Sequence, residues 1–234
     1  MAGKHQTVYN KKNYTFDTLK LYDPYRNRQI PVAVYKPKIF NQKTVIVNHG
    51  YGQNKGGDYL AYTYITETLA AEGYFVISIQ HELSTDSLLP LTGNAQIVRR
   101  PFWERGADNI LFVLNELKQW YPENSFTHIS LFGHSNCGDM VALFPQKYPG
   151  IVEKIITLDN RRMALPKASV PKVLSLRSID QLADEGVLPT VAEQEQFEIK
   201  IIKLSNTLHN DMDDNANNLQ RKEITDYILS FLHQ

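Results

Sequence analysis

The chain has 234 residues, in which 25 lysines and arginines balance 25 aspartates and glutamates, so its formal net charge is zero. This balance gives no general electrostatic attraction to nucleic acid or to an anionic membrane surface. The single cysteine excludes an internal disulfide, the first residues lack the apolar core of a secretory signal, and no apolar run reaches membrane-spanning length. No linker divides the sequence, so we expect one cytoplasmic domain over residues 1–234.

The first elements along the chain are extended. Residues 14–21 and 30–35 alternate apolar and polar side chains around a polar turn, which predicts an antiparallel hairpin. Residues 44–48 form a short β-branched run that is typical of a fully buried strand. A helix is predicted over about 58–71, and Gly73 would end it.

The middle and the end of the chain alternate strands with helices. Residues 75–79 predict another buried strand, an irregular stretch follows over about 81–100, and a helix is expected to begin at Pro101, where the missing N–H costs nothing. Residues 129–132 read as a strand that leads into a tight turn. The remaining expected elements are a helix near 140–147, strands at 155–158, 173–176 and 199–204, and a last helix around 224–232.

Apolar strands that alternate with helices indicate a mostly parallel sheet covered on both faces. In such sheets, catalytic and binding groups gather beyond the carboxyl ends of the strands. Several chemically active side chains directly follow predicted strands, and we expect them to share one site: Tyr51, His81, Ser135, Asp159, Asp180 and His209.

The sequence Gly133-His134-Ser135-Asn136-Cys137 follows a buried strand and looks like a nucleophile elbow. A serine hydroxyl is a weak nucleophile unless a sharp strand-to-helix turn exposes it beside a base. The usual G-x-S-x-G pattern has glycine where this chain has Cys137. Because Cys137 lies past the apex of the turn, we interpret it as a packed core residue rather than as a thiol nucleophile.

The order of the candidate residues is more specific than the elbow motif. An opening hairpin, a His49-Gly50-Tyr51-Gly52 turn after the third strand, Ser135 after the fifth strand, an aspartate and then His209 resemble the α/β-hydrolase superfamily over nearly the whole chain. The resemblance implies an α/β fold with a mostly parallel eight-stranded sheet and helices on both faces. Only residues 160–172 separate strands six and seven, which is too short for a large cap domain, and this makes the chain similar to small carboxylesterases and dienelactone-hydrolase-like members. Dienelactone hydrolases proper carry a cysteine at the apex, where this chain has Ser135.

The resemblance assigns roles to the residues of the site. Ser135 would be the nucleophile and His209 the general base, while the backbone N–H groups of Tyr51 and Asn136 would form the oxyanion hole. The acid that orients the base is expected to be Asp180, which follows strand seven. Asp159, directly after strand six, and Asp184 are the alternatives.

Three further histidines border the expected site. His49 and His134 are given structural or oxyanion-loop roles by the resemblance, and His81 is interpreted as a hydrogen-bonded lining residue.

Two segments and three arginines bear on the substrate. Residues 83–100 and 182–196 are candidates for a cover over an otherwise open site, with ordinary packed loops as the equal alternative. Arg161, Arg162 and Arg177 fall near strand ends, where a guanidinium group would meet an acidic group of a substrate. Structural ion pairs with Asp159, Asp180 or Glu82 are the favoured interpretation of these arginines.

The sequence therefore predicts a carboxylic ester hydrolase of the serine type, free of metal and cofactor, that cleaves a small-molecule ester or thioester through an acyl-enzyme. A hydrolase-fold protein used for ligand binding or signalling with little turnover is the alternative from another class, and a peptidase is the alternative within the enzymes. No nucleic-acid partner is expected, and the sequence carries no signal for a particular oligomeric state.

Overall fold

The computed structural model describes residues 13–122, 124 and 126–234. Eight strands form one sheet in the order β1-β2-β4-β3-β5-β6-β7-β8. The strands β1 and β2 form the antiparallel hairpin, β2 pairs antiparallel with β4, and all other pairs are parallel. The strand bounds are β1 Tyr14–Asp23, β2 Arg28–Pro37, β3 Lys43–Asn48, β4 Phe75–Ile79, β5 His128–His134, β6 Lys154–Leu158, β7 Lys172–Arg177 and β8 Lys200–Lys203.

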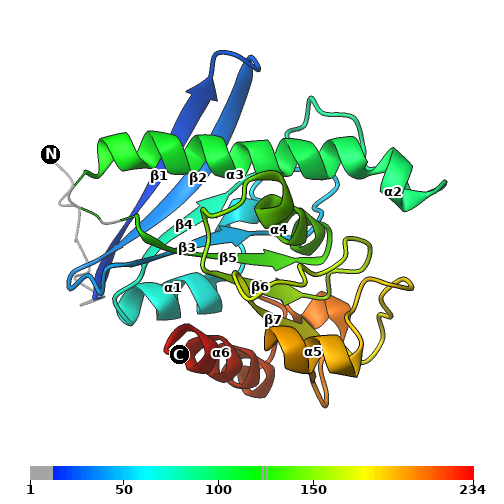
Figure 1. The fold of residues 1–234 in the computed structure, drawn as a ribbon. Helices are drawn as coiled ribbons and strands as arrows, with labels where there is room; N and C mark the ends of the chain where they lie inside the picture. Colours follow the sequence, from blue (N-terminus) through cyan, green and yellow to red (C-terminus); the bar gives the residue numbers. More distant parts are fainter. Residues whose placement is uncertain (1–12, 123, 125) are drawn as a thin grey trace, which may run out of the picture.

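Helices cover both faces of this sheet (Figure 1). Helices α3 and α4 lie on one face, and α1 and α6 lie on the other. The helix bounds are α1 Thr63–Ala71, α2 Ala95–Val98, α3 Arg100–Trp120, α4 Ser135–Lys147, α5 Val191–Phe197 and α6 Asn218–Leu232, with short 3-10 turns at Asp58–Leu60 and His209–Asp211. The expected mostly parallel sheet with helices on both faces is confirmed.

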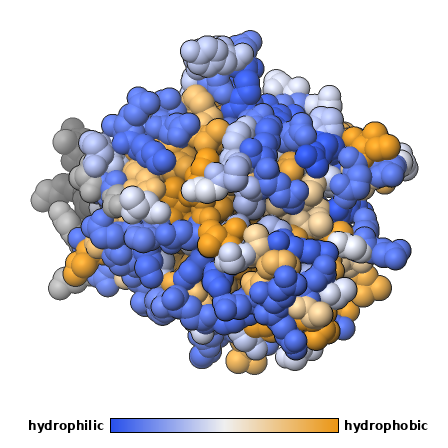
Figure 2. Space-filling view, viewed as in Figure 1, coloured by the Kyte–Doolittle hydropathy of each residue, from blue (hydrophilic) through white to orange (hydrophobic). Residues whose placement is uncertain are grey.

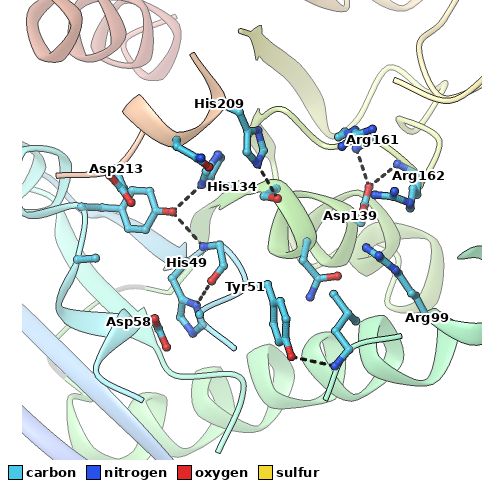
Figure 3. Close-up of a pocket in the computed structure, with 18 of the residues that line it drawn as sticks. His49, Tyr51, Asp58, Arg99, His134, Asp139, Arg161, Arg162, His209 and Asp213 are labelled. Carbon is cyan, nitrogen blue, oxygen red and sulfur yellow. Dashed lines mark hydrogen bonds between the residues drawn. The ribbon is translucent and has the colours of Figure 1, made fainter. Parts of the chain in front are cut away.

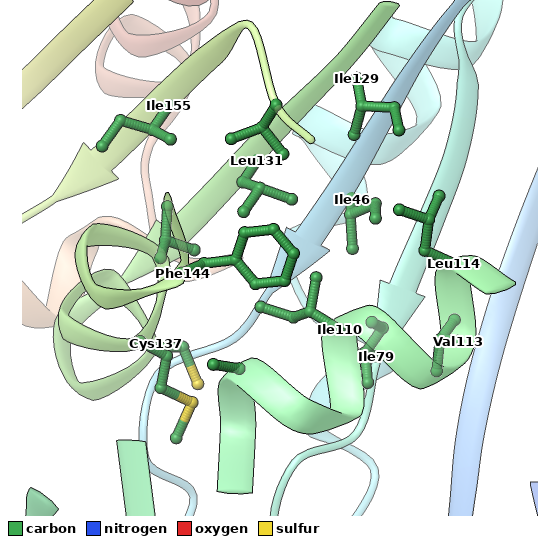
Figure 4. Close-up of a cluster of buried hydrophobic side chains, with 14 of the residues drawn as sticks. Ile46, Ile79, Ile110, Val113, Leu114, Ile129, Leu131, Cys137, Phe144 and Ile155 are labelled. Atoms are coloured by element: carbon green, nitrogen blue, oxygen red, sulfur yellow. The ribbon is translucent and has the colours of Figure 1, made fainter. Parts of the chain in front are cut away.

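Two apolar layers explain why the central strands are buried on both faces. Successive side chains of a strand point to opposite faces, so Ile46 of β3 packs under α3 and α4 while Val45 and Val47 pack under α1 and α6. Figure 4 shows the first layer, in which Ile110 of α3 and Phe144 of α4 meet the strand side chains. The face of the molecule seen in Figure 2 is largely hydrophilic, with apolar groups between the polar ones.

The structure differs from the predicted elements at several helices. The helix expected over 58–71 is divided, because Tyr62 adopts a left-handed conformation with φ of 63° just before α1. Helix α4 begins at Ser135, five residues earlier than expected, since the tight turn leads straight into it. Helix α5 takes up the end of the 182–196 stretch, a candidate for a cover or a packed loop, and Thr190 and Glu193 form a capping box at its start.

The register of the parallel strands aligns their carboxyl ends. Asn48 at the end of β3 pairs with Gly133 of β5, and Leu158 at the end of β6 pairs with both His134 and Leu176. The residues that follow these strands therefore emerge at the same edge of the sheet, which is where the candidate site lies.

Candidate active site

Ser135 occupies the apex of a sharp turn between β5 and α4. Its φ is 53°, a left-handed conformation that is strained for a residue with a side chain. Gly133 permits the turn, because a methyl group there would collide with the carbonyl oxygen of Cys137 and lie 2.7 Å from a methyl carbon of Val141. The turn thus has the geometry of a nucleophile elbow, with the Ser135 side chain at the wall of a cavity.

Cys137 lies behind this turn in the apolar layer under α4 (Figure 4). Its side chain is fully buried. Burial raises the pKa of the thiol well above its ordinary value, so the sulfur stays protonated and unreactive. Cys137 is therefore a packed core residue in the structure, as the sequence predicted.

Two hydrogen bonds connect Ser135, His209 and Asp159. The hydroxyl of Ser135 lies 3.0 Å from Nε2 of His209, and Nδ1 of the same ring lies 2.9 Å from Oδ2 of Asp159. A carboxylate only accepts hydrogen bonds, so Nδ1 carries the proton and Nε2 is free to accept the serine hydroxyl. The arrangement can remove a proton from Ser135 and stabilise the imidazolium that results.

Asp159 is held as a carboxylate although it is fully buried. Burial raises its pKa, but the hydrogen bonds from His209 and Ser178 and the charge of Arg177 outweigh this effect, and the pKa lies below its ordinary value. The second oxygen, Oδ1, accepts the backbone N–H of Ser178 at 2.8 Å and lies 3.6 Å from Nε of Arg177. The buried charge is thus fully surrounded by donors.

The expected position of the acid needs a correction. Asp180 is exposed, and its Oδ1 accepts the backbone N–H of His209 at 2.8 Å instead of contacting the imidazole. Asp184 also lies away from the ring, with its carboxylate 4.0 Å from Nε of Arg162. The reason is the chain path after β6: Asp159 has a φ of 50°, and this turn carries its carboxylate past the end of β7 to the His209 loop.

Tyr51 and Asn136, the two residues expected to supply oxyanion-hole donors, both line the cavity that holds Ser135. Asn136 lies in the first turn of α4, where backbone N–H groups have no acceptor within the helix. The Tyr51 hydroxyl accepts the backbone N–H of Leu89 at 2.9 Å, so the ring anchors the 83–100 segment against the site (Figure 3). The side chain of Tyr51 therefore attaches the 83–100 segment to the turn after β3.

The turn after β3 is fixed by a hydrogen-bonded chain that sequence reasoning missed. The backbone N–H of Gly50 donates to the hydroxyl of Tyr62 at 3.0 Å, and this hydroxyl donates to Nδ1 of His134 at 2.6 Å (Figure 3). Burial, followed by the nearby His209, lowers the pKa of His134 to about 3, so the ring is neutral and able to accept. Tyr62 gave no sequence signal because it belongs to no motif.

A buried polar layer supports the turn after Ser135. The side-chain amide of Asn136 accepts from Nε1 of Trp103 at 2.9 Å and donates to Glu82 at 3.4 Å. His49 accepts the backbone N–H of His81 at 3.1 Å and donates to the Gly50 carbonyl at 2.6 Å. His49 thus has the structural position expected for it. His81 is hydrogen-bonded as expected but is buried and does not line the cavity, which corrects its interpretation as a lining residue. The contact of Glu82 with Asn136 was not foreseen.

The cavity above these residues has a volume of about 380 Å³. Three arginines gather on one side of it together with Asp139, whereas Asp58 and Asp213 lie on the other side (Figure 3). Residues with ionisable or nucleophilic side chains that line it include Asp58, Arg99, His134, Ser135, Asp139, Arg161, Arg162, His209 and Asp213. Arg99 and Asp139 were not identified from the sequence as site residues.

Two further observations concern residues 13–122, 124 and 126–234. These residues contain no cluster of three or more histidine, cysteine, aspartate or glutamate side chains arranged to hold a metal ion. None of their helices combines the length and the apolar character needed to cross a membrane.

Solved structures with this architecture have been found, although no protein-family model and no curated protein matches the sequence. The Francisella virulence factor BioJ is 13% identical over 94% of this chain and 85% of that chain, with a TM-score of 0.67. An α/β serine hydrolase homologue from Coxiella burnetii is 15% identical over 92% and 97% of the two chains, with a TM-score of 0.62. Esterase 2 of Thermogutta terrifontis is 11% identical over 97% and 96%, with a TM-score of 0.65. With its sheet order, elbow and these similarities over nearly its full length, the chain has the α/β-hydrolase fold.

Proposed function

We propose that the protein is a serine hydrolase that cleaves a small carboxylic ester or thioester through an acyl-enzyme on Ser135. The observation that carries the proposal is the pair of hydrogen bonds from Ser135 to His209 and from His209 to Asp159, at 3.0 and 2.9 Å. This arrangement supplies a nucleophile, a base and an orienting carboxylate in one line. The names of the similar structures, a serine hydrolase homologue and an esterase among them, support the same class.

In the proposed reaction, Oγ of Ser135 attacks the carbonyl carbon while Nε2 of His209 takes the hydroxyl proton. The carbonyl oxygen becomes an oxyanion, which the backbone N–H groups of Tyr51 and Asn136 would stabilise by about 3 kcal/mol for each donor. Collapse of the tetrahedral intermediate expels the alcohol or thiol, which receives the proton from His209. A water molecule then repeats the sequence on the acyl-enzyme and releases the carboxylic acid.

Asp159 is the orienting acid in this proposal, and Asp180 acts through the backbone of the His209 loop. A carboxylate at Nδ1 keeps the proton on that nitrogen and stabilises the imidazolium. The depressed pKa of Asp159 means that it carries this charge at neutral pH. Asp180, by contrast, accepts only the His209 main-chain N–H.

The test is covalent labelling of Ser135. A fluorophosphonate probe should add one group at this residue, seen by intact mass and peptide mapping, and Ser135→Ala should abolish both the labelling and the turnover of p-nitrophenyl acetate. Organophosphorus chemistry is a fitting choice, because one of the similar structures is an esterase phosphorylated by paraoxon. Ser230→Ala, a change of the same kind at an exposed position of α6, serves as the control. Undiminished turnover in Ser135→Ala would sink the assignment.

A further inference from the structure

We infer that Arg99, Arg161 and Arg162 form a subsite for a carboxylate group of the substrate, so that the preferred substrate is a small ester or thioester with one anionic end. All three side chains line the cavity that holds Ser135. The inference deepens the proposed function and rests on it for the reaction, while anion binding at the subsite is separately measurable.

The arginine loop is attached close to the nucleophile. Oδ1 of Asp139 accepts the backbone N–H groups of Arg161 and Arg162 at 3.0 and 2.9 Å. Asp139 lies four residues after Ser135 on α4, which corresponds to about 6 Å along a helix axis. A carboxylate held by these arginines would therefore be separated from the reacting carbonyl by only a short chain.

Arg99 reaches the same side of the cavity from a different part of the chain. It lies between α2 and α3, and the side chain of Gln96 on α2 donates to the carbonyl oxygen of Arg162. Figure 3 shows the side chains of Arg99, Arg161 and Arg162 on the side of the cavity where Asp139 lies. Three guanidinium groups thus face one end of the pocket.

Within the described part of the chain, these guanidinium groups are poorly neutralised. Nε of Arg99 donates to the carbonyl oxygen of Pro90 at 2.9 Å, and Nε of Arg161 donates to that of Leu182 at 3.1 Å. Neither forms an ion pair with a carboxylate of the described residues, and Arg162 has only Asp184 at the limiting distance of 4.0 Å. Asp139 is their buried carboxylate neighbour, and its Oδ1 already accepts three backbone N–H groups.

Burial makes this lack of partners costly. Arg99 is 9% exposed, and burial, followed by the charge of Arg162, lowers the pKa of its guanidinium group. A desolvated charge without a partner is unfavourable, and an anion that enters would offset the cost. Arg177 shows the contrast, because it donates to the Asn160 carbonyl at 2.7 Å and lies 3.6 Å from Asp159, which fits the structural role favoured from the sequence.

The charges at the two ends of the cavity would orient an anionic substrate. Asp58 and Asp213 line it there (Figure 3), so an anion would be repelled from that end and attracted to the arginines. The planar guanidinium fork matches the two oxygens of a carboxylate. The cavity volume of about 380 Å³ suits a small molecule rather than a long chain.

The experiment compares esters that differ only in the terminal group. We expect kcat/KM for p-nitrophenyl hemisuccinate and hemiglutarate to exceed that for p-nitrophenyl butyrate and valerate at least tenfold, roughly the value of one charge-assisted hydrogen bond. The rate with Ser135→Ala is subtracted, because a neighbouring carboxylate hydrolyses such esters without an enzyme. Arg99→Gln, Arg161→Gln and Arg162→Gln should each lower this preference, measured as the ratio of kcat/KM for the charged ester to that for the neutral ester in the same variant.

Arg100→Gln is the matched control, because it removes the same charge from the next residue, which pairs with Glu104 and does not line the cavity. The preference of Arg100→Gln for charged over neutral esters should equal that of the unmodified protein. Equal kcat/KM for charged and neutral esters, or a preference that none of the three variants changes, would overturn the subsite.

Binding of free glutarate separates the subsite from the reaction. Calorimetry with Ser135→Ala should detect glutarate binding that weakens about tenfold when Arg162→Gln is added. If no ester is turned over but glutarate binds in this way, the proposed function fails and the subsite stands. If esters are turned over and glutarate does not bind, the subsite fails and the proposed function stands. Tighter binding of inorganic phosphate than of glutarate would contradict the carboxylate assignment.

Discussion

Nδ1 of His209 lies 2.9 Å from Oδ2 of Asp159, and this contact joins the loop after β8 to the end of β6. Because Asp159 is fully buried and accepts a further backbone hydrogen bond from Ser178, the carboxylate has little freedom to rotate. The imidazole is consequently oriented with Nε2 toward Ser135, at 3.0 Å. The backbone N–H of His209 is held separately by Asp180.

Asp159 contacts the His209 ring and Asp180 contacts the His209 backbone, so the two aspartate-to-asparagine changes should have different effects. Asp159→Asn should lower kcat by about four orders of magnitude, because the amide cannot stabilise the imidazolium and favours the wrong tautomer. Asp180→Asn should lower kcat less than tenfold, roughly the scale of one weakened hydrogen bond, since its side-chain oxygen can still accept the His209 N–H. Steady-state kinetics on p-nitrophenyl acetate, with unfolding midpoints as the check on folding, measures both. A larger loss of kcat in Asp180→Asn than in Asp159→Asn would show that Asp180, and not Asp159, is the acid.

The second prediction concerns the lack of room for a side chain at Gly133 in the elbow. Gly133→Ala would place a methyl group 2.7 Å from a methyl carbon of Val141 and against the Cys137 carbonyl oxygen, so the turn must shift. We expect a loss of at least about 2 kcal/mol in unfolding free energy, together with a loss of activity. Denaturant unfolding and ester turnover measure the two effects.

Cys137→Ala is the companion variant for the elbow. It should cost only about 1 kcal/mol and leave activity within a few-fold, because it removes one buried sulfur and leaves the turn unchanged. The folded protein should also resist iodoacetamide, since burial raises the pKa of the thiol. Rapid modification that abolishes turnover would show instead that Cys137 takes part in the reaction.

The lowered pKa of His134 predicts that the stability of the protein depends on pH. Its pKa falls from 6.5 to about 3 on folding, so the unfolded chain binds a proton between these values that the folded chain does not. The free energy of unfolding should therefore decrease as the pH falls from 6.5 toward 3, and His134 should account for about 1.4 kcal/mol of this decrease per pH unit. Above pH 6.5 His134 is neutral in both states and should cause no loss of stability.

The variant for this measurement is His134→Gln, whose side-chain oxygen can still accept the Tyr62 hydroxyl. Urea unfolding at several pH values should give it a shallower slope than the unmodified protein. His81, also buried with a lowered pKa, contributes to the slope in both proteins and so cancels in the comparison. Identical slopes would mean that His134 is protonated in the folded protein.

Much of the architecture was predictable because its signals are local. Residues 45–47 are all apolar, 75–79 are apolar except at Ser78, and both faces of these strands are buried in the structure. The elbow was predictable for the same reason, since Gly133 and Ser135 meet steric demands within a few residues of one another. Even α5 had a local signal in the spacing of Thr190 and Glu193, which the surrounding polar residues obscured.

The remaining parts of the site depend on tertiary contacts that no local pattern encodes. Asp159 reaches His209 because of its own left-handed backbone, a conformation that aspartate accepts but that its neighbours do not signal. Arg99 lines the cavity because the 83–100 segment is held by Tyr51, through a hydrogen bond to a backbone N–H that any residue could supply. The sequence order therefore brought the correct strands together but favoured Asp180, whereas the carboxylate that contacts the His209 ring in the structure is that of Asp159.

The left-handed conformations of Ser135 and Asp159, at φ of 53° and 50°, have a consequence for engineering. Each costs roughly 1 kcal/mol that a glycine would not. Selection for thermostability alone would therefore favour glycine at Ser135, whereas at Asp159 the loss of the contacts with Ser178, His209 and Arg177 would outweigh the gain. These residues stand at the ends of neighbouring strands in the centre of the sheet. A stabilised variant obtained without an activity screen would thus tend to lose Ser135, the proposed nucleophile, and a screen for heat resistance should hold this position constant.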